Sequence, residues 1–212
     1  MTLKKFSKLL KFIIFSKFVY RKPKKSKYLI FDQNNFSFLK KYIKEKDISI
    51  LYTRGEIFNM FVIINNFLNF KFSLLDYYNS YIDCVDPKII ITFSDNDPAF
   101  YLIKKKGSRK KIMIQNAWKN EYSDSVFLLN KRNKKFNVDY ILAFNNHIGK
   151  KFCSFINGKS FSIGSFKSNS YKFKNYKKKF DLLYISSYRS NVHQRMTPNL
   201  TWAEFDRPQR IL

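Results

Sequence analysis

Short apolar segments alternate along this chain with polar turns and with segments of helical periodicity. The clearest apolar segment is 89–92, a run of β-branched residues between Pro87 and the polar turn 94–98. An apolar run without in-and-out alternation is typical of a strand buried on both faces of a parallel sheet. Pro98 suits the first turn of a helix. We therefore predict a central buried strand, a turn and a helix.

The same succession recurs on both sides of this stretch. Strands are predicted at 28–31, 48–52, 89–92, 111–114, 139–144 and 160–163. Helical patterns are predicted at 36–43, 56–70, 74–85, 98–105 and 148–155, with a loop at 119–137 and a turn at Asn157 and Gly158. Strands that alternate with helices specify a parallel sheet with right-handed crossovers. The predicted fold class is α/β, a Rossmann-like parallel sheet flanked by helices.

The two ends of the chain depart from this pattern. Residues 1–27 form a basic amphipathic segment and a linker, with a helical pattern that Arg21 and Pro23 interrupt. Residues 28–166 form the Rossmann-like domain. The remaining predicted segments are a linker at 167–180, the first strand of a truncated second α/β domain at 181–190, and an atypical tail at 191–212.

The tail differs in composition from the rest, because the last twenty or so residues contain no lysine. We interpret it as the product of a frameshift, a gene truncation or a cloning scar. The alternative is an ordinary C-terminal tail.

Composition supplies a hydrophobic core and an extreme charge. Hydrophobic residues make up 45% of the chain and the formal net charge is +26. Three explanations of the charge stay open: a lysine bias without a partner, an anionic membrane surface, or a nucleic acid. Lysine is scattered and arginine, which reads bases in pairs of hydrogen bonds, is scarce, so we rank nucleic acid last.

The N-terminal segment bears on localisation. Its apolar stretch is interrupted by Lys17 and is too short to span a bilayer. We expect a cytoplasmic protein that contacts the anionic inner face of the membrane through residues 1–22. The alternative is that this segment packs on the domain or is a basic tail.

Metal and cofactor signals are absent from the sequence. Cys84 and Cys153 lie far apart and belong to no cluster of cysteine and histidine, so we expect no metal. Gly164 and Ser165 lack the GxGxxG pattern, so we expect no dinucleotide cofactor.

Polar side chains follow the predicted strands at their carboxyl ends. The candidate binding residues are Asp32, Arg54, Asn96, Gln115, Asn116, Asn145 and Ser165, and Asp95 is the candidate catalytic base. Strand ends of a parallel sheet share one edge, where open α/β sheets bind ligands. Carboxylates and amides suit a hydroxyl-rich sugar, and a base accepts the proton of an attacking hydroxyl. The alternative for Asp95 is that it only caps the next helix.

Several segments occur in an order that resembles a known family. They are 29–32, 53–56, 87–92 with 95–96, 114–116, 138–140, 163–166 and 183–189. Together they resemble bacterial surface carbohydrate biosynthesis proteins, which are transferases with two Rossmann-like domains (the GT-B fold). The residue after Asn116 is Ala117, where relatives tend to carry a glycine.

The resemblance implies a role in making lipopolysaccharide or capsule. It implies that this N-terminal half holds a sugar or lipid-linked acceptor, and that the missing C-terminal domain holds a nucleotide-activated donor. We therefore expect the acceptor-side domain of a glycosyltransferase-like enzyme, truncated and inactive alone. The alternative is a basic nucleic-acid-binding or membrane-surface protein without catalysis.

Overall fold

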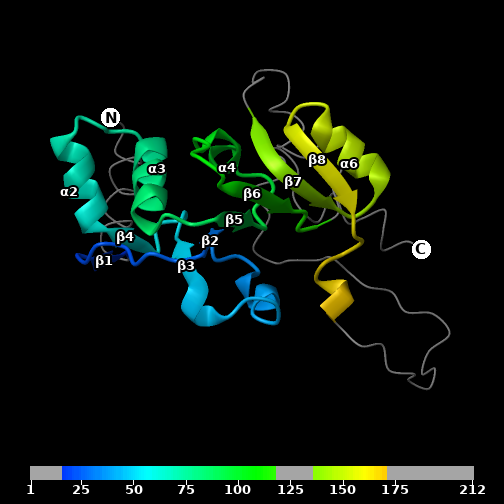
Figure 1. The fold of residues 1–212 in the computed structure, drawn as a ribbon, viewed down its shortest axis with the longest axis horizontal. Coiled ribbons are helices and arrows are strands. Elements are labelled where there is room, and N and C mark those ends of the chain that lie inside the picture. Colours follow the sequence, from blue (N-terminus) through cyan, green and yellow to red (C-terminus); the bar gives the residue numbers. More distant parts are fainter. Residues whose placement is uncertain (1–15, 118–135, 171–212) are drawn as a thin grey trace, which may run out of the picture. The chain divides into compact units, whose positions relative to one another are not determined.

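The computed structural model describes residues 16–117 and 136–170 (Figure 1). Contacts divide the chain into a unit of Met1–Lys172 and a unit of Phe173–Leu212, and all described residues belong to the first. Several predicted segments lie outside the described residues: residues 1–15, most of the loop at 119–137, most of the linker at 167–180, the strand at 181–190 and the tail at 191–212.

A parallel sheet of six strands forms the centre of the described unit. The strands are β2 (Tyr28–Phe31), β3 (Ile48–Leu51), β5 (Ile89–Thr92), β6 (Lys110–Ile114), β7 (Asn137–Ala143) and β8 (Asn157–Ser162). They lie in the order β3-β2-β5-β6-β7-β8, and every pairing is parallel. The predicted fold class, an α/β protein with a Rossmann-like parallel sheet, is confirmed.

The strand order reverses at β2. The chain first adds β3 on one side of β2 and then returns to place β5 on the other side, so Ile30 lies between Ile50 and Ile91. All later strands extend the sheet beyond β5. In open α/β sheets the ligand crevice lies outside the carboxyl ends of the strands at such a reversal. The topology therefore directs attention to the residues that follow β2 and β5.

Residues of β5 alternate between the two faces of the sheet. Ile90 packs in a core cluster with α3 (Leu74–Val85), α4 (Pro98–Leu102) and α6 (Asn146–Cys153), whereas Ile91 packs in a second cluster with Leu39 of the 3-10 helix η1 (Phe36–Leu39). Ile90 is 0% and Ile91 6% exposed. The prediction that this strand is buried on both faces is confirmed.

The helix predicted at 74–85 is confirmed to the residue as α3. Its start is fixed by a capping box, in which the Ser73 hydroxyl accepts from the backbone N–H of Asp76 at 3.0 Å and the Asp76 carboxylate accepts from the backbone N–H of Ser73 at 3.3 Å. Its end is fixed by Asp86, whose left-handed backbone (φ 50°) stops the helix.

A second, two-stranded parallel sheet was not predicted. It pairs β1 (Lys17–Val19) with β4 (Ile57–Asn59), so the helix predicted at 56–70 begins only at Met60, as α2 (Met60–Leu68). Asn59 explains this boundary, because its Oδ1 accepts from the backbone N–H of Val62 at 3.1 Å. The helical pattern predicted to run through Lys17–Val19 is wrong for the same reason, since these residues pair with β4.

Other boundaries differ from the prediction in smaller ways. The segment at 36–43 contains the short 3-10 helix η1, and further 3-10 turns occur at Glu45–Asp47 and Ser168–Ser170. The helix α4 ends at Leu102, and the Lys111 ammonium donates to the carbonyls of Tyr101 and Ile103 at this end, each at 3.1 Å.

The turn predicted at Asn157 and Gly158 is instead the start of β8. A Cβ on Gly158 would lie 2.7 Å from the carbonyl oxygen of Val138, so the glycine allows β7 and β8 to approach. None of the helices formed by residues 16–117 and 136–170 is long and apolar enough to cross a bilayer.

Candidate functional site

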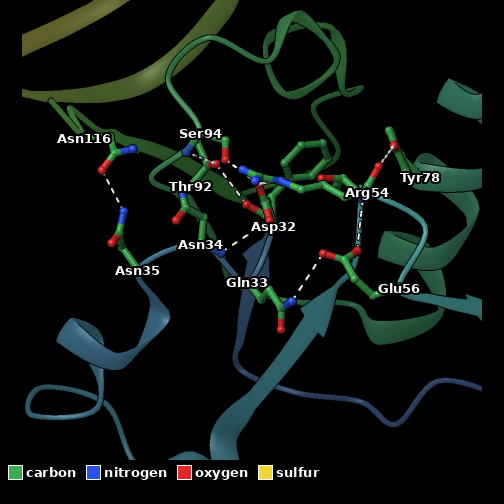
Figure 2. A network of polar contacts seen from close by, with 12 residues as sticks. Asp32, Gln33, Asn34, Asn35, Arg54, Glu56, Tyr78, Thr92, Ser94 and Asn116 are labelled. Atoms are coloured by element: carbon green, nitrogen blue, oxygen red, sulfur yellow. Dashed lines mark hydrogen bonds and ion pairs between the residues drawn. The ribbon is translucent and has the colours of Figure 1, made fainter. Parts of the chain in front are cut away.

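Asp32 lies at the carboxyl end of β2, in the centre of a polar network (Figure 2). Its residue surface is only 2% exposed, and its backbone adopts a left-handed φ of 70°. A buried carboxylate is stable only where it is paired and hydrogen-bonded. Oδ2 accepts from Arg54 Nη2 at 2.7 Å, from Arg54 Nε at 3.0 Å and from the Ser94 hydroxyl at 2.5 Å. The carboxylate is thus held by two neighbouring strand ends.

Thr92, the last residue of β5, places Ser94 over Asp32. The Thr92 hydroxyl donates to the carbonyl of Phe31 at 2.9 Å and accepts from the backbone N–H of Ser94 at 2.9 Å. These bonds join the ends of β2 and β5 at the point where the strand order reverses. A β-branched residue that also carries a hydroxyl therefore completes the strand and shapes the turn that follows.

Arg54 follows β3 and reaches across to Asp32. Glu56 turns back onto this loop, where its carboxylate accepts from the backbone N–H of Arg54 at 3.1 Å and from Gln33 Nε2 at 3.2 Å. Gly55 permits the tight loop with a φ of 84°. The Arg54 side chain is 59% exposed while its Asp32 partner is 3% exposed. The guanidinium is thus held by the buried Asp32 carboxylate and remains accessible to solvent.

These strand ends border a pocket of about 280 Å³. Its lining is Asp32, Thr53, Arg54, Ser94, Asn96, Asp97 and Pro98. The lining carries carboxylates, hydroxyls, an amide and a guanidinium, the groups that recognise sugar hydroxyls and phosphate. Among the described residues, no group of His, Cys, Asp and Glu is placed to hold a metal ion.

Asp97 is the carboxylate of this pocket that caps the next helix. Its Oδ1 accepts from the backbone N–H of Ala99 at 2.9 Å, which fixes the start of α4. Burial raises the pKa of the Asp97 carboxyl, the Ala99 N–H opposes this, and the negative charge of Asp32 raises the pKa further. Arg54 lowers the pKa by a smaller amount. The net result is that the pKa of the Asp97 carboxyl is raised above its ordinary value.

Asp95, the base predicted from the sequence, lies beside this pocket and is not part of its lining. It is 2% exposed, and its Oδ2 accepts from the backbone N–H of Asn116 at 3.0 Å. The side-chain oxygen of Asn116 in turn accepts from Asn35 Nδ2 at 2.6 Å. Asp95 and Asn116 thus join the ends of β5 and β6 to the segment before η1. A catalytic role for Asp95 stays a prediction.

The other predicted residues satisfy backbone groups farther along the sheet edge. The Oε1 of Gln115 accepts from the backbone N–H of Phe144 at 2.8 Å. The Oδ1 of Asn145 accepts from Ile148 at 2.9 Å and caps α6, and the Ser165 hydroxyl accepts from the backbone N–H of Ser168 at 3.2 Å. The structure therefore brings Asp32, Arg54 and Asn96 together in the pocket, and leaves Gln115, Asn145 and Ser165 outside its lining.

Sequence reasoning missed four pocket residues: Thr53, Ser94, Asp97 and Pro98. Ser94 and Asp97 belong to the polar turn after the central strand, where Asp97 before Pro98 has the pattern of a helix cap. The position of Ser94 two residues after β5 is a signal that could have found it. The strand-order reversal beside it is known only from the structure.

Comparison with protein families gives a match over the C-terminal part of the chain. Residues 112–206 match a family described as "putative O-antigen biosynthesis protein". Within the described residues this range covers most of β6 and all of β7, α6 and β8, whereas the pocket residues precede it. No curated protein and no solved structure matches the chain. The match supports a role in surface carbohydrate biosynthesis, the process that the sequence motifs indicated.

Proposed function

We propose that this chain is the acceptor-side domain of a glycosyltransferase-like enzyme in surface polysaccharide biosynthesis. The observation that carries the proposal is the pocket at the β2–β5 reversal, where a buried Asp32 holds the exposed Arg54 guanidinium. Open α/β sheets bind ligands at this place. The family match over 112–206 supports the process, and the pocket supports the chemistry.

The pocket suits one sugar unit that carries a phosphate. Its volume of about 280 Å³ lies near the lower limit of ligand pockets, so it fits a single unit better than a polymer. Arg54 offers a planar guanidinium that pairs with phosphate oxygens. Ser94 and Asn96 offer a hydroxyl and an amide to the sugar hydroxyls. A sugar phosphate or a lipid-linked sugar is thus the acceptor class that we propose.

In the proposed reaction an acceptor hydroxyl attacks the anomeric carbon of a nucleotide-activated donor. The new glycosidic bond forms as the bond to the nucleotide diphosphate breaks, and a carboxylate takes the hydroxyl proton. Asp32 and Asp97 both line the pocket, but Oδ2 of Asp32 is taken by Arg54 and Ser94, whereas the bond from Ala99 uses Oδ1 of Asp97. We propose Asp97 Oδ2 as the proton acceptor, beside the sequence candidate Asp95. The donor itself belongs to a C-terminal domain, as the GT-B resemblance implies.

Binding of glucose 1-phosphate to the full chain tests the proposal. We expect glucose 1-phosphate to shift the backbone amide NMR signals of 94–97 and of Arg54. Inorganic phosphate should shift the signal of Arg54. Glucose alone should bind more weakly than glucose 1-phosphate. Arg54→Ala should weaken glucose 1-phosphate binding about tenfold or more, because it removes a charge-assisted contact.

The control is Lys104→Ala, which removes an exposed cation outside the pocket. This variant should bind glucose 1-phosphate as the wild type does. Equal losses in both variants, or shifts confined to residues outside the pocket, would contradict the proposal.

A further inference from the structure

Large apolar side chains are exposed on α2, on the turn that joins it to α3 and at the start of α3. Figure 1 shows where these two helices lie. They are Phe61, Ile64, Phe67, Leu68, Phe70, Phe72 and Leu74, with exposed fractions from 37% to 84%. We name this set the α2 surface. The ring of Phe72 contacts those of Phe67 and Phe70, with centroids 5.8 and 6.5 Å apart. Contiguous apolar surface of this kind marks an interaction site.

Phe70 breaks a local rule of helix ends. It follows the C-cap Asn69 with a left-handed φ of 55°, and the N–H of Lys71 bonds to the carbonyl of Asn66 at 2.9 Å. This is a Schellman ending, in which glycine or asparagine normally takes the position of Phe70. The phenyl group is nevertheless 84% exposed. A residue that neither the helix end nor the core favours indicates a role at a surface contact.

The α2 surface is flanked by positive charge. Residues 57–75 contain one charged residue, Lys71, and no acidic residue. The strand β1, which pairs with β4, carries the exposed Lys17, and Arg21 and Lys22 are exposed in the segment that follows it. Asn59 Nδ2 donates to the carbonyl of Arg21 at 2.9 Å. The next acidic residue, Asp76, is engaged in the capping box of α3. The charge of Lys71 also acts on the Asp76 carboxylate and helps to lower its pKa. Aromatic residues beside a surplus of cations are complementary to an anionic lipid surface.

A groove that is lined in part by the α2 surface has the same character. It measures about 380 Å³, and its lining includes Phe67, Lys71 and Phe72. Asn66 also lines it and is 4% exposed, and its Oδ1 has no hydrogen-bond partner among the described residues. A buried acceptor without a donor costs free energy unless a bound group supplies one. Lys71 suits a lipid phosphate, and Asn66 suits a headgroup hydroxyl.

We propose that the α2 surface docks on an anionic lipid bilayer, with Phe70 and Phe72 entering the interface and Lys71 meeting lipid phosphate. The proposal does not rest on the proposed function, since the α2 surface and the Asp32–Arg54 pocket share no residue. It adds an apolar docking element to the contact that the sequence predicted for residues 1–22.

Vesicle co-sedimentation of the full chain tests the proposal. The wild type should bind vesicles made of equal parts of phosphatidylglycerol and phosphatidylcholine. It should bind vesicles of pure phosphatidylcholine far less. The double variant Phe70→Asn with Phe72→Ser should bind the anionic vesicles at least about tenfold more weakly, because it removes two apolar anchors. Asparagine is chosen at 70 because it suits the left-handed position.

The matched control is Phe161→Ser, which removes a 49% exposed aromatic side chain. Phe161 lies on β8, an edge strand of the six-stranded sheet, and does not belong to the α2 surface. This variant should bind as the wild type does. Equal binding by the wild type and the double variant would overturn the proposal and assign the contact to charge or to residues 1–15. A double variant that instead changes the mass in solution would assign the α2 surface to a second copy, which also overturns it.

A depth measurement separates insertion from charge alone. In a Phe72→Trp variant, the added tryptophan fluorescence should be quenched by phosphatidylglycerol with brominated acyl chains, relative to the wild type. The same quenching in both proteins would show that residue 72 stays outside the interface.

Discussion

The hydroxyl oxygen of Ser94 lies 2.5 Å from Oδ2 of Asp32, although the two residues are 62 positions apart in the sequence. The bond joins the ends of β2 and β5, the strands on either side of the point where the strand order reverses. The same Oδ2 accepts two bonds from Arg54. One buried oxygen therefore organises the loops after three adjacent strands.

Substitution at this bond should lower stability. Ser94→Ala leaves the buried Asp32 with one donor fewer, and we expect it to lower the free energy of unfolding by about 1–2 kcal/mol. Asp32→Asn should cost a similar amount, because the 59% exposed Arg54 side chain recovers water when its partner is neutralised. Urea unfolding followed by circular dichroism measures both. A Ser94→Ala variant as stable as the wild type would show that the bond contributes nothing.

The pKa of Asp97 should respond to its two charged neighbours in opposite directions. It should exceed 3.8 in the folded wild type, because burial disfavours the carboxylate. Asp32→Asn should lower the pKa, since a negative neighbour is lost, and Arg54→Ala should raise it, since a positive neighbour is lost. Carbon NMR titration of the side-chain carboxyl follows each change. Shifts of the same sign in both variants would refute this reading of the pocket.

Lys111 should make stability depend on pH. Its ammonium lies in the core at 1% exposure, and burial lowers its pKa from 10.5 to about 7. Between these values the unfolded chain binds one proton more than the folded chain, so the free energy of unfolding rises with pH across this window. The contribution of Lys111 to stability is correspondingly lost as the pH falls from 10.5 toward 7. The slope should approach about 1.4 kcal/mol per pH unit.

Lys111→Met should remove that slope, whereas Lys104→Met should keep it, because Lys104 is exposed. The measurement is urea unfolding at several pH values from 6 to 10. Lys111→Met should also cost about 1–3 kcal/mol at neutral pH, since the carbonyls of Tyr101 and Ile103 lose their donor. An unchanged slope in this variant would mean that Lys111 does not titrate in the window.

Gly158→Ala should destabilise the β7–β8 pair. The added Cβ would lie 2.7 Å from the backbone oxygen of Val138, which cannot move aside without disturbing β7. We expect a loss of about 1–3 kcal/mol in the free energy of unfolding. Gly149→Ala is the comparison, because the nearest atoms to its Cβ belong to side chains, of Ser160 at 3.0 Å and of Ala143 at 3.5 Å. A smaller loss for Gly158 than for Gly149 would contradict the expected clash.

Most strands of the six-stranded sheet were predictable because they contain a short apolar run with polar residues near its end, a pattern that β8 lacks. The segment at 89–92 shows this well, since both of its faces are buried. The pairing of β1 with β4 was not predictable, because Ile57 and Phe58 continue a helical pattern and only the partner strand and the Asn59 cap separate them from α2. Local periodicity cannot report a partner that lies forty residues away.

The site was predictable in part for a related reason. A position at the carboxyl end of a strand places a residue on the correct edge, as for Asp32 and Arg54, but does not fix what its side chain bonds. Gln115 follows the same rule and yet serves the backbone of Phe144. Asp97 was overlooked because its capping role hides its place in the pocket.

Asn59 divides its amide between two tasks, with Oδ1 on the first turn of α2 and Nδ2 on the carbonyl of Arg21. The segment that enters the domain and the helix that carries the exposed phenylalanines are therefore fastened by one side chain. A cation drawn to a surface at Arg21 would orient α2 in the same step. An alanine at position 59 would remove both bonds at once, and the leading segment would then be joined to the start of α2 only through the pairing of β1 with β4.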